Sequence, residues 1–202
     1  MQVKELLSEK KQLRAHYLAL RAAIPTAEKA ALDAALCRKI AKHPAFLSCD
    51  TLLCFSPVRD EPNFTALFEL ARKRGVKTAF PRCKGTQMSF HVIESERALE
   101  PGRFGIPTPC ESAPLAVCTA RTLCLLPALS VARDGTRLGY GGGFYDRFLA
   151  DFPGVTLLPI YSTLVCDALP REQTDIPVSH ILTEKGEIFI GTSSAPAPPL
   201  CP

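Results

Sequence analysis

The sequence lacks the features that would place it in a membrane or in an oxidising compartment. No apolar run approaches the ~20 residues that span a bilayer. The N-terminal stretch MQVKELLSEKK is charged, with no apolar signal core and no small-residue cleavage site. Nine cysteines are present, but their number is odd and no C-x-x-C pair occurs, which excludes the usual disulfide frameworks and metal-site spacings. We therefore expect a soluble, cytoplasmic protein whose cysteines stay reduced.

A strong charge imbalance is also missing. The 202 residues carry a net charge of +4, with 47% hydrophobic and 22% charged residues, which is ordinary globular composition. The mild positive charge suits an anionic ligand, but there is no stripe of alternating basic and aromatic residues of the kind that binds RNA. No internal repeat occurs. Length and composition predict a single domain over residues 1–190, followed by a disordered tail rich in proline and serine over 191–202.

Hydrophobic periodicity predicts strands that alternate with helices. The expected helices cover residues 4–24, 26–40, 64–74 and 144–150. The expected strands cover residues 51–55, 77–81, 88–93, 123–129, 155–162 and 180–186. This alternation indicates an α/β fold with a largely parallel sheet, and residues 108–116 are expected to form a long surface loop.

Glycine is concentrated in one short segment. Four of the five residues from Gly139 to Gly143 are glycine, and the segment lies between the expected strand 123–129 and a short helix. Glycines at the carboxyl end of a parallel strand let backbone N–H groups approach an anion closely. A plain turn is the alternative, but it needs fewer glycines, so phosphate binding is favoured. The segment matches neither G-x-x-x-x-G-K-[ST] nor G-x-G-x-x-G, because Phe144 stands where the last glycine of the second pattern would be.

Charged residues accompany this loop. Asp146 would repel a polyphosphate unless a cation lies between them, and Mg²⁺ suits that position, although an aspartate that stabilises a helix dipole is an equal alternative. Lys10, Arg14 and Arg21 share one face of the first helix. Such a stripe is usually a solvated cationic face, and phosphate contact is the alternative.

Five motifs in order carry a resemblance to a known family. They are K-x-x-L-R (10–14), D-E-P (60–62), G-I-P-x-P (105–109), D-G-x-R-L-G-x-G-G-G-F-Y-D-R-F-L (134–149) and D-I-P-V-x-x-I-L-T-E (175–184). Together they resemble the 5-formyltetrahydrofolate cyclo-ligase family over nearly the whole chain except the tail. The resemblance implies a three-layer α/β/α sandwich and an ATP- and Mg²⁺-dependent enzyme. It implies that the enzyme cyclises 5-formyltetrahydrofolate to 5,10-methenyltetrahydrofolate with release of ADP and phosphate.

The resemblance also assigns residues. It implies ATP binding by Lys10, Arg14, Arg137, Leu138, Gly139, Tyr140, Gly141, Gly142, Gly143, Phe144 and Tyr145. The folate substrate is assigned to Val58, Glu61, Asn63 and to the loop residues Tyr140, Gly141, Gly142, Gly143 and Phe144, and the metal to Asp146 and Asp175. The catalytic assignment is Arg137, Tyr145 and Arg147, where Arg147 replaces the charge of a lysine that some members carry at the position of Gly142. Phe64 and Ala132 are further departures from the family pattern.

The implied chemistry explains the residue types. A formamide oxygen is a poor leaving group, and transfer of the γ-phosphoryl group to it makes it a good one before the neighbouring folate nitrogen attacks. Such a transfer needs cations and oriented N–H groups rather than a nucleophilic side chain. We expect a monomer whose partner is a reduced formyl-folate, with no nucleic acid and no membrane. The competing hypothesis is a non-catalytic nucleotide- or anion-binding regulatory module.

Overall fold

A seven-stranded sheet forms the centre of the molecule. The computed structural model describes residues 2–102 and 105–190, so the predicted tail at 191–202 lies outside the described residues. The strand order is β12-β11-β9-β6-β1-β2-β3. No helix within the described ranges is long and apolar enough to cross a membrane.

The sheet is parallel except at its two edges. Its strands are β1 (Thr51–Leu53), β2 (Lys77–Lys84), β3 (Gln87–Val92), β6 (Thr122–Leu125), β9 (Val155–Pro159), β11 (His180–Leu182) and β12 (Glu187–Phe189). The five central strands pair in parallel, whereas the edge strands β3 and β12 pair antiparallel with β2 and β11. The prediction of a largely parallel sheet is confirmed.

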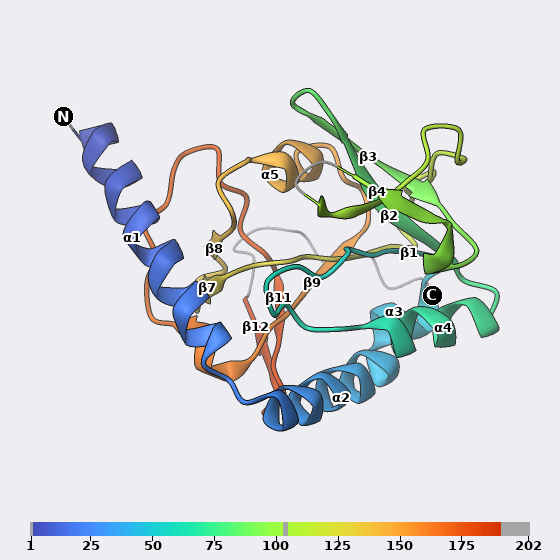
Figure 1. Cartoon of the computed structure of the whole chain (residues 1–202), viewed down its shortest axis with the longest axis horizontal. Helices are drawn as coiled ribbons and strands as arrows, with labels where there is room; N and C mark the ends of the chain where they lie inside the picture. Colours follow the sequence, from blue (N-terminus) through green and yellow to red (C-terminus); the bar gives the residue numbers. More distant parts are fainter. Residues whose placement is uncertain (1, 103–104, 191–202) are drawn as a thin grey trace, which may run out of the picture.

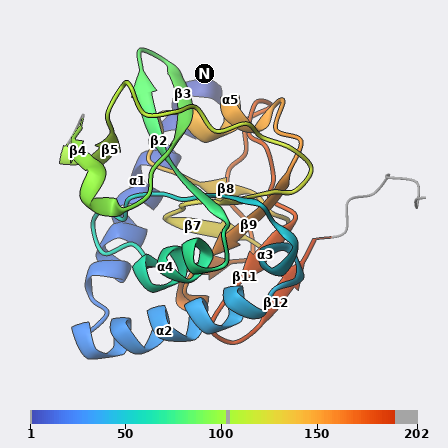
Figure 2. The ribbon, with the colours of Figure 1, turned by 90° about the vertical axis from the view of Figure 1, so that its right-hand side faces the viewer.

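Helices cover both faces of this sheet, as the three-layer prediction requires. They are α1 (Gln2–Ala22), α2 (Thr26–Lys42), α3 (Pro44–Ser48), α4 (Thr65–Lys73) and α5 (Phe144–Leu149). Figure 1 shows α2, α3 and α4 below the sheet and α5 above it, and the rotated view of Figure 2 shows the same layers. The long helix α1 lies at one side of the molecule (Figure 1). Pro25, in extended conformation, separates α1 from α2, and Gly75 follows α4 with a φ of 77°, as the sequence predicts.

The core is built from the central strands. All residues of β1 and β6 are buried, which agrees with their uninterrupted apolar sequence. Cys54 and Cys124 are fully buried within this layer, and burial raises the pKa of both thiols well above its usual range. The interpretation of these two cysteines as core thiols is confirmed.

The predicted strand 123–129 is shorter than expected, and a small sheet stands between it and the glycine loop. β6 ends at Leu125, because Pro127 has no N–H group to donate to a ladder. The chain then forms a sheet of order β10-β7-β8, made of β7 (Ser130–Ala132), β8 (Arg137–Leu138) and β10 (Val165–Cys166). The β7–β8 turn has Gly135 at a φ of 87°, and a β-carbon there would overlap the carbonyl oxygen of Val178.

Two further segments differ from the prediction. Residues 180–186 form no single strand, because a turn from Thr183 to Gly186 separates β11 from β12. The segment 108–116 is largely a loop, as predicted, although its start belongs to a two-stranded sheet of β4 (Leu99–Pro101) and β5 (Pro107–Pro109). Both differences come from short strands, which leave little periodicity in the sequence.

Candidate active site

The cationic face of α1 points into the molecule and not to solvent. Lys10 is 5% exposed and Arg21 is 1% exposed, whereas Arg14 is half-buried. The usual interpretation of such a stripe, a solvated cationic face, is therefore wrong for Lys10 and Arg21. Burial of a lysine requires paired charges, and these come from a segment more than 160 residues away that local spacing does not reveal.

Lys10 is held by two carboxylates. Its Nζ donates to Asp175 Oδ2 and to Glu172 Oε1, both at 2.7 Å, and the backbone N–H of Glu172 also donates to Asp175. Burial lowers the pKa of Lys10, but the hydrogen bonds and charges of Asp175 and Glu172 outweigh it, so the net pKa is raised. Lys10 is therefore a firmly protonated cation that contacts one of the two residues assigned to the metal.

Arg21 connects three parts of the site, although the sequence patterns assign it no function beyond the stripe. Its guanidinium donates to the carbonyls of Arg59 and Ala128 and to the hydroxyl of Tyr140, at 3.0, 3.2 and 2.6 Å. Its Nη1 lies 3.9 Å from Glu61 Oε1. Arg21 thus joins α1 to the segments that follow β1 and β6 and to the glycine loop. Its shared face with Lys10 and Arg14 was the signal that could have identified it.

The glycine loop lies beside α1. Arg14 Nε donates to the carbonyl of Gly139 at 2.9 Å. Gly141 has a φ of 93°, and a β-carbon there would lie 3.1 Å from the Arg14 guanidinium. Glycine therefore lets the loop approach the side chain of Arg14 on α1. Within residues 2–102 and 105–190, the N–H groups of residues 139–143 donate to no acceptor. The loop therefore offers backbone donors of the kind that bind an anion.

Arg137 and Asp146 form the second ion pair of the site. Arg137 Nη2 donates to Asp146 Oδ1 at 2.8 Å, and the same oxygen accepts from the N–H of Ile176 at 3.3 Å. The Arg137 side chain is 5% exposed, and its buried Nη1 finds no hydrogen-bond acceptor within the described residues. An unpartnered buried cationic N–H is costly, and an anionic ligand would remove that cost.

The two remaining catalytic candidates flank this pair. Tyr145 lies with its ring centroid 5.7 Å from the Arg137 guanidinium, and burial raises the pKa of the Tyr145 hydroxyl well above its usual range. Tyr145 is therefore a neutral hydrogen-bond donor and not a base at neutral pH. Arg147 is exposed, and its guanidinium donates to the carbonyls of Gly142 and Thr86 at 2.8 and 2.9 Å. Arg147 thus contacts the loop at Gly142, and its catalytic assignment stays a prediction.

Glu61 supplies the carboxyl group among the residues assigned to the folate, and this group is buried. It is 4% exposed, its Oε2 accepts from the N–H of Val58 at 3.0 Å, and its buried Oε1 meets no hydrogen-bond donor among residues 2–102 and 105–190. Burial raises the pKa of Glu61, and the Val58 N–H and the Arg21 charge only partly oppose this. Arg59 and Asp60 have positive φ angles of 46° and 64°, so the backbone folds back to bring Glu61 inward.

Asn63 and Phe64 have structural partners. Asn63 is exposed, and its Oδ1 accepts from the N–H of Thr65 at the start of α4. Phe64 is 1% exposed and packs edge-on against Phe55 in the core. The folate assignment of Asn63 stays a prediction, and the departure at Phe64 affects the core beneath the site.

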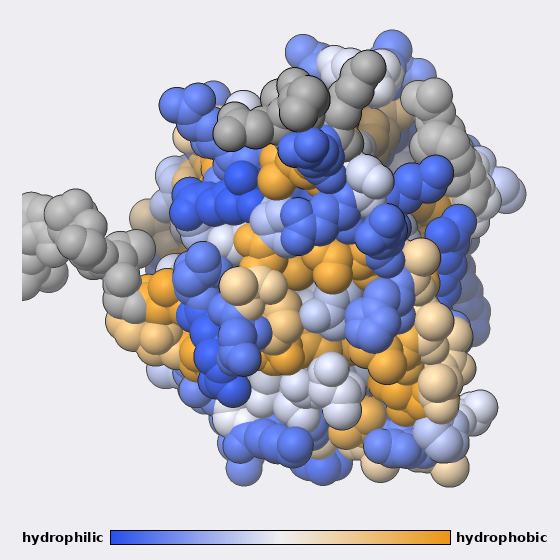
Figure 3. Space-filling view, turned by 90° about the vertical axis from the view of Figure 1, so that its left-hand side faces the viewer, coloured by the Kyte–Doolittle hydropathy of each residue, from blue (hydrophilic) through white to orange (hydrophobic). Residues whose placement is uncertain are grey.

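Two hollows of the described surface, of about 330 and 580 Å3, are lined by residues outside the assigned set. Figure 3 shows the side of the molecule that carries α1, where a hydrophobic area is bordered by hydrophilic residues. Tyr140 is 41% exposed and Leu20, on α1, is also 41% exposed, so apolar surface lies close to the buried charges. Such a surface suits a ligand that combines aromatic rings with negative charge.

Comparisons with known proteins agree with this geometry. The family model described as the 5-formyltetrahydrofolate cyclo-ligase family matches residues 7–184. A 5-formyltetrahydrofolate cyclo-ligase of Mycolicibacterium smegmatis is 29% identical over 147 residues, which cover 69% of this chain and 76% of the relative. The mouse enzyme of the same name is 25% identical over 191 residues, covering 88% and 94% of the two chains.

Two solved structures have folds similar to that of this chain. The NMR structure of Aquifex aeolicus 5,10-methenyltetrahydrofolate synthetase has a TM-score of 0.79 and 28% identity, covering 93% of this chain and 96% of that one. The 5,10-methenyltetrahydrofolate synthetase from Mycoplasma pneumoniae has a TM-score of 0.70 and 22% identity, covering 87% and 99%, and supports the fold alone.

Proposed function

Because the chain belongs to the 5-formyltetrahydrofolate cyclo-ligase family, we propose that it closes 5-formyltetrahydrofolate to 5,10-methenyltetrahydrofolate at the expense of ATP, with release of ADP and phosphate. The family consists of ligases, which favours this proposal over the non-catalytic binding module. The observation that carries the proposal is the pairing of the assigned residues. Lys10 pairs with Asp175 and Arg137 pairs with Asp146, so two of the three cations assigned to ATP contact a carboxylate assigned to the metal.

The residues present fit ATP and Mg²⁺. The buried Nη1 of Arg137 lacks an acceptor, and the loop N–H groups of residues 139–143 point to no acceptor in the described chain. Asp146 and Asp175 are the hard oxygen donors that Mg²⁺ prefers. Mg²⁺, when bound between these carboxylates and the phosphates, would neutralise the repulsion between them. Lys10, Arg14 and Arg137 would hold the phosphate oxygens, and Lys10 and Arg137 would exchange a carboxylate partner for a phosphate partner.

The chain's own groups then position the reaction. The phosphoryl group passes to the formyl oxygen, which leaves as phosphate when the neighbouring folate nitrogen attacks the formyl carbon. Arg137 would stabilise charge on the transferred group, and the neutral Tyr145 hydroxyl beside it would donate a hydrogen bond without competing as a base. Arg147 fixes the loop through the carbonyl of Gly142. No covalent attachment to the protein is needed.

Glu61 is proposed to orient the folate. Its buried Oε1 has no hydrogen-bond partner in the part of the chain that the structure describes, and its carboxyl group lies beside Arg21 and Tyr140. A ring with N–H donors would satisfy this oxygen. Val58 contributes through its N–H, which fixes the other carboxylate oxygen at 3.0 Å. Glu61 therefore links the substrate to the same network that fixes the phosphate loop.

The decisive experiment is a product assay. Purified protein is incubated with 5-formyltetrahydrofolate, ATP and Mg²⁺, and the methenyl product is followed by absorbance while ADP is quantified separately. We expect equal amounts of methenyl product and ADP, and no product when ATP or Mg²⁺ is omitted. ATP binding without turnover of any reduced formyl-folate would support the binding module instead.

A further inference from the structure

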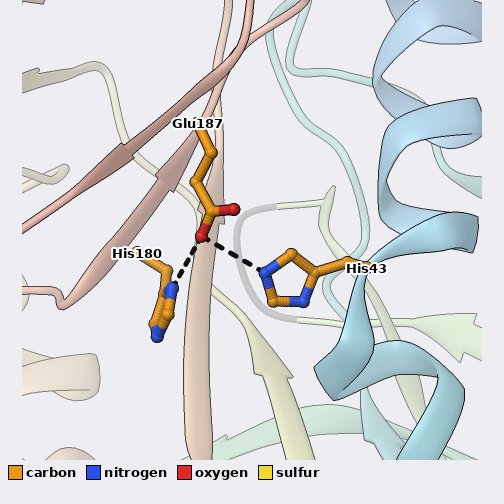
Figure 4. Close-up of side chains that lie close together, drawn as sticks. All are labelled: His43, His180 and Glu187. Carbon is orange, nitrogen blue, oxygen red and sulfur yellow. Dashed lines mark hydrogen bonds and ion pairs between the residues drawn. The ribbon is translucent and has the colours of Figure 1, made fainter.

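Three potential metal-ligand side chains meet at a place distant in sequence from the glycine loop. His43 lies at the junction of α2 and α3, His180 begins β11, and Glu187 begins β12. Their nearest ligand atoms all lie within 4.8 Å of one another. Figure 4 shows both imidazole rings directed at one carboxylate oxygen. None of the three belongs to the residues proposed for ATP, folate or Mg²⁺.

The distances are close to those of a coordinated ion. Glu187 Oε1 lies 2.7 Å from His180 Nδ1 and 3.3 Å from His43 Nε2. Zinc bonds of ~2.0–2.1 Å in tetrahedral geometry separate the ligand atoms by roughly 3.3 Å. Small side-chain movements therefore suffice to place an ion among the three atoms.

The surroundings fix the two rings and leave an open position. The rings of His43 and His180 meet edge-on with centroids 5.6 Å apart, and Phe189 packs edge-on against His180 at 5.1 Å. The His43 side chain is 8% exposed, whereas those of His180 and Glu187 are 23% and 35% exposed. An ion could thus enter from the solvent side, where water would complete its coordination.

We propose that His43, His180 and Glu187 form a binding site for one divalent transition-metal ion, with Zn²⁺ as the best match to two imidazoles and one carboxylate. Mg²⁺ prefers oxygen ligands, so this site differs in chemistry from the one proposed at Asp146 and Asp175. The ion would join the β11–β12 hairpin to the α2–α3 corner. Its effect is therefore structural and separate from the proposed reaction.

Metal binding would require the protons on the two imidazole rings to change position. His43 Nδ1 accepts from the N–H of Ala45, which places the proton of the neutral ring on Nε2, toward Glu187. Binding through Nε2 moves this proton to Nδ1 and breaks the bond to Ala45. His180 can carry its own proton on Nε2 while Nδ1 binds.

The test is a titration with Co²⁺, whose visible absorption reports coordination geometry, in excess Mg²⁺ and without ATP. We expect one equivalent to bind with bands of a tetrahedral nitrogen–oxygen site, and Zn²⁺ to displace it. His180→Ala and Glu187→Gln should each weaken binding by more than the roughly 10- to 100-fold lost when only a group that orients a ligand is removed. Glu187→Gln keeps an oxygen acceptor for both rings, so it tests the ion separately from the hydrogen bonds.

Two controls keep the result specific. His16→Ala removes an exposed histidine on α1, and Asp146→Asn alters the proposed Mg²⁺ site, and both should bind Co²⁺ as the wild type does. Far-ultraviolet circular dichroism of each metal-free variant verifies folding. Equal Co²⁺ affinity in wild type, His180→Ala and Glu187→Gln would overturn the proposal. Absorption bands of thiolate ligation would overturn it as well, because they would place the ion on cysteines. In that case the cluster is a hydrogen-bonded contact only.

Discussion

The ammonium group of Lys10 lies 2.7 Å from a carboxylate oxygen of Asp175, although 165 residues separate them in the chain. Arg137 and Asp146 form a second such pair. In the structure both cations are already paired with carboxylates. Ligand binding must therefore exchange partners and cannot simply fill an empty set of charges.

Lys10→Ala tests how strongly this balance stabilises the protein. We expect a lower melting temperature without ligand, because Asp175 and Glu172 remain side by side without their cation. A loss of about 1.5–3 kcal/mol is typical for a hydrogen bond to a charged group, and roughly 2–4 °C of melting temperature accompanies each kcal/mol in a chain of this size. Arg14→Ala is the matched control. In the described part of the chain, the Arg14 side chain donates a hydrogen bond to a backbone carbonyl and pairs with no carboxylate.

Both variants should also bind ATP more weakly, by a similar ~1.5–3 kcal/mol for each lost charged hydrogen bond. Isothermal titration in the presence of Mg²⁺ measures this loss. Adding Glu172→Gln to Lys10→Ala should recover part of the stability without recovering ATP affinity. Unchanged ATP affinity in both single variants would remove Lys10 and Arg14 from the ATP site.

ATP and Mg²⁺ should strengthen each other's binding. Without Mg²⁺, ATP must compete with Asp175 for Lys10 and with Asp146 for Arg137, and without ATP, Mg²⁺ must compete with the two cations for the carboxylates. A coupling of about 1–3 kcal/mol, or roughly 5- to 150-fold in affinity, is the usual range for linked sites. Titrations of ATP with and without a chelator measure the coupling. Equal ATP affinity in the two conditions would show that the ion pairs do not open on binding.

Glu61→Gln should make the ligand-free protein more stable at neutral pH while weakening folate binding. Burial raises the pKa of Glu61 above its ordinary value of 4.5 in the folded state. The folded protein therefore holds this proton more tightly than the unfolded chain. The stability that the protonated carboxyl group contributes is present below pH 4.5 and is lost as pH rises through the raised pKa.

Thermal unfolding of wild type and Glu61→Gln across this pH range measures the effect. The difference in melting temperature between them should grow as pH rises through the raised pKa. Glu69→Gln, at an exposed position of α4, controls for loss of one negative charge. Parallel stability curves for wild type and Glu61→Gln would contradict a perturbed carboxyl group at this position.

The sequence predicted the layers of the fold because its signals were local. Apolar runs gave the buried strands β1 and β6, and Pro25 and Gly75 marked helix boundaries that the structure confirms. The β7–β8 hairpin was missed, although Asp134 and Gly135 form the kind of dipeptide that favours a tight turn between strands. Very short strands carry too few residues for a period of two to be recognised.

The sequence indicated which residues belong to the site more successfully than it indicated which of them contact each other. The shared face of Lys10, Arg14 and Arg21 could be read from helical spacing, but their burial depends on Glu172, Asp175 and Glu61. Contacts over such separations are determined by the packing of α1 against the rest of the chain. The cluster of His43 with His180 was invisible for the same reason, because the histidines are isolated in sequence.

Asp146→Asn separates three functions of one carboxylate. If Asp146 only complements the dipole of α5, the substitution is nearly silent, since asparagine is also accepted near a helix start. If Asp146 binds Mg²⁺, turnover falls strongly and higher Mg²⁺ recovers part of it. The structure adds the third function, because Asp146 is the ion-pair partner of Arg137, whose side chain is 5% exposed.

This pair reverses the stability effect that the sequence suggests. From sequence alone, Asp146 is an uncompensated carboxylate near other acidic residues, and its neutralisation should leave the ligand-free protein unchanged or more stable. With Arg137 beside it, neutralisation leaves a buried guanidinium without its counter-ion, and its Nη1 already lacks an acceptor. We therefore expect the ligand-free protein to lose about 1.5–3 kcal/mol. Asp167→Asn is the control, because its pair with Arg133 is exposed and should contribute little.

Turnover against Mg²⁺ concentration and ligand-free melting temperature, measured on the same preparations, distinguish the three cases. A lower melting temperature with a shifted Mg²⁺ curve supports both the ion pair and the metal function. A lower melting temperature with overlapping Mg²⁺ curves leaves only the ion pair and removes the reason to assign Asp175 to the metal. The double variant Arg137→Gln/Asp146→Asn should be more stable than the sum of the single losses predicts, because neither charge is then left alone in the site.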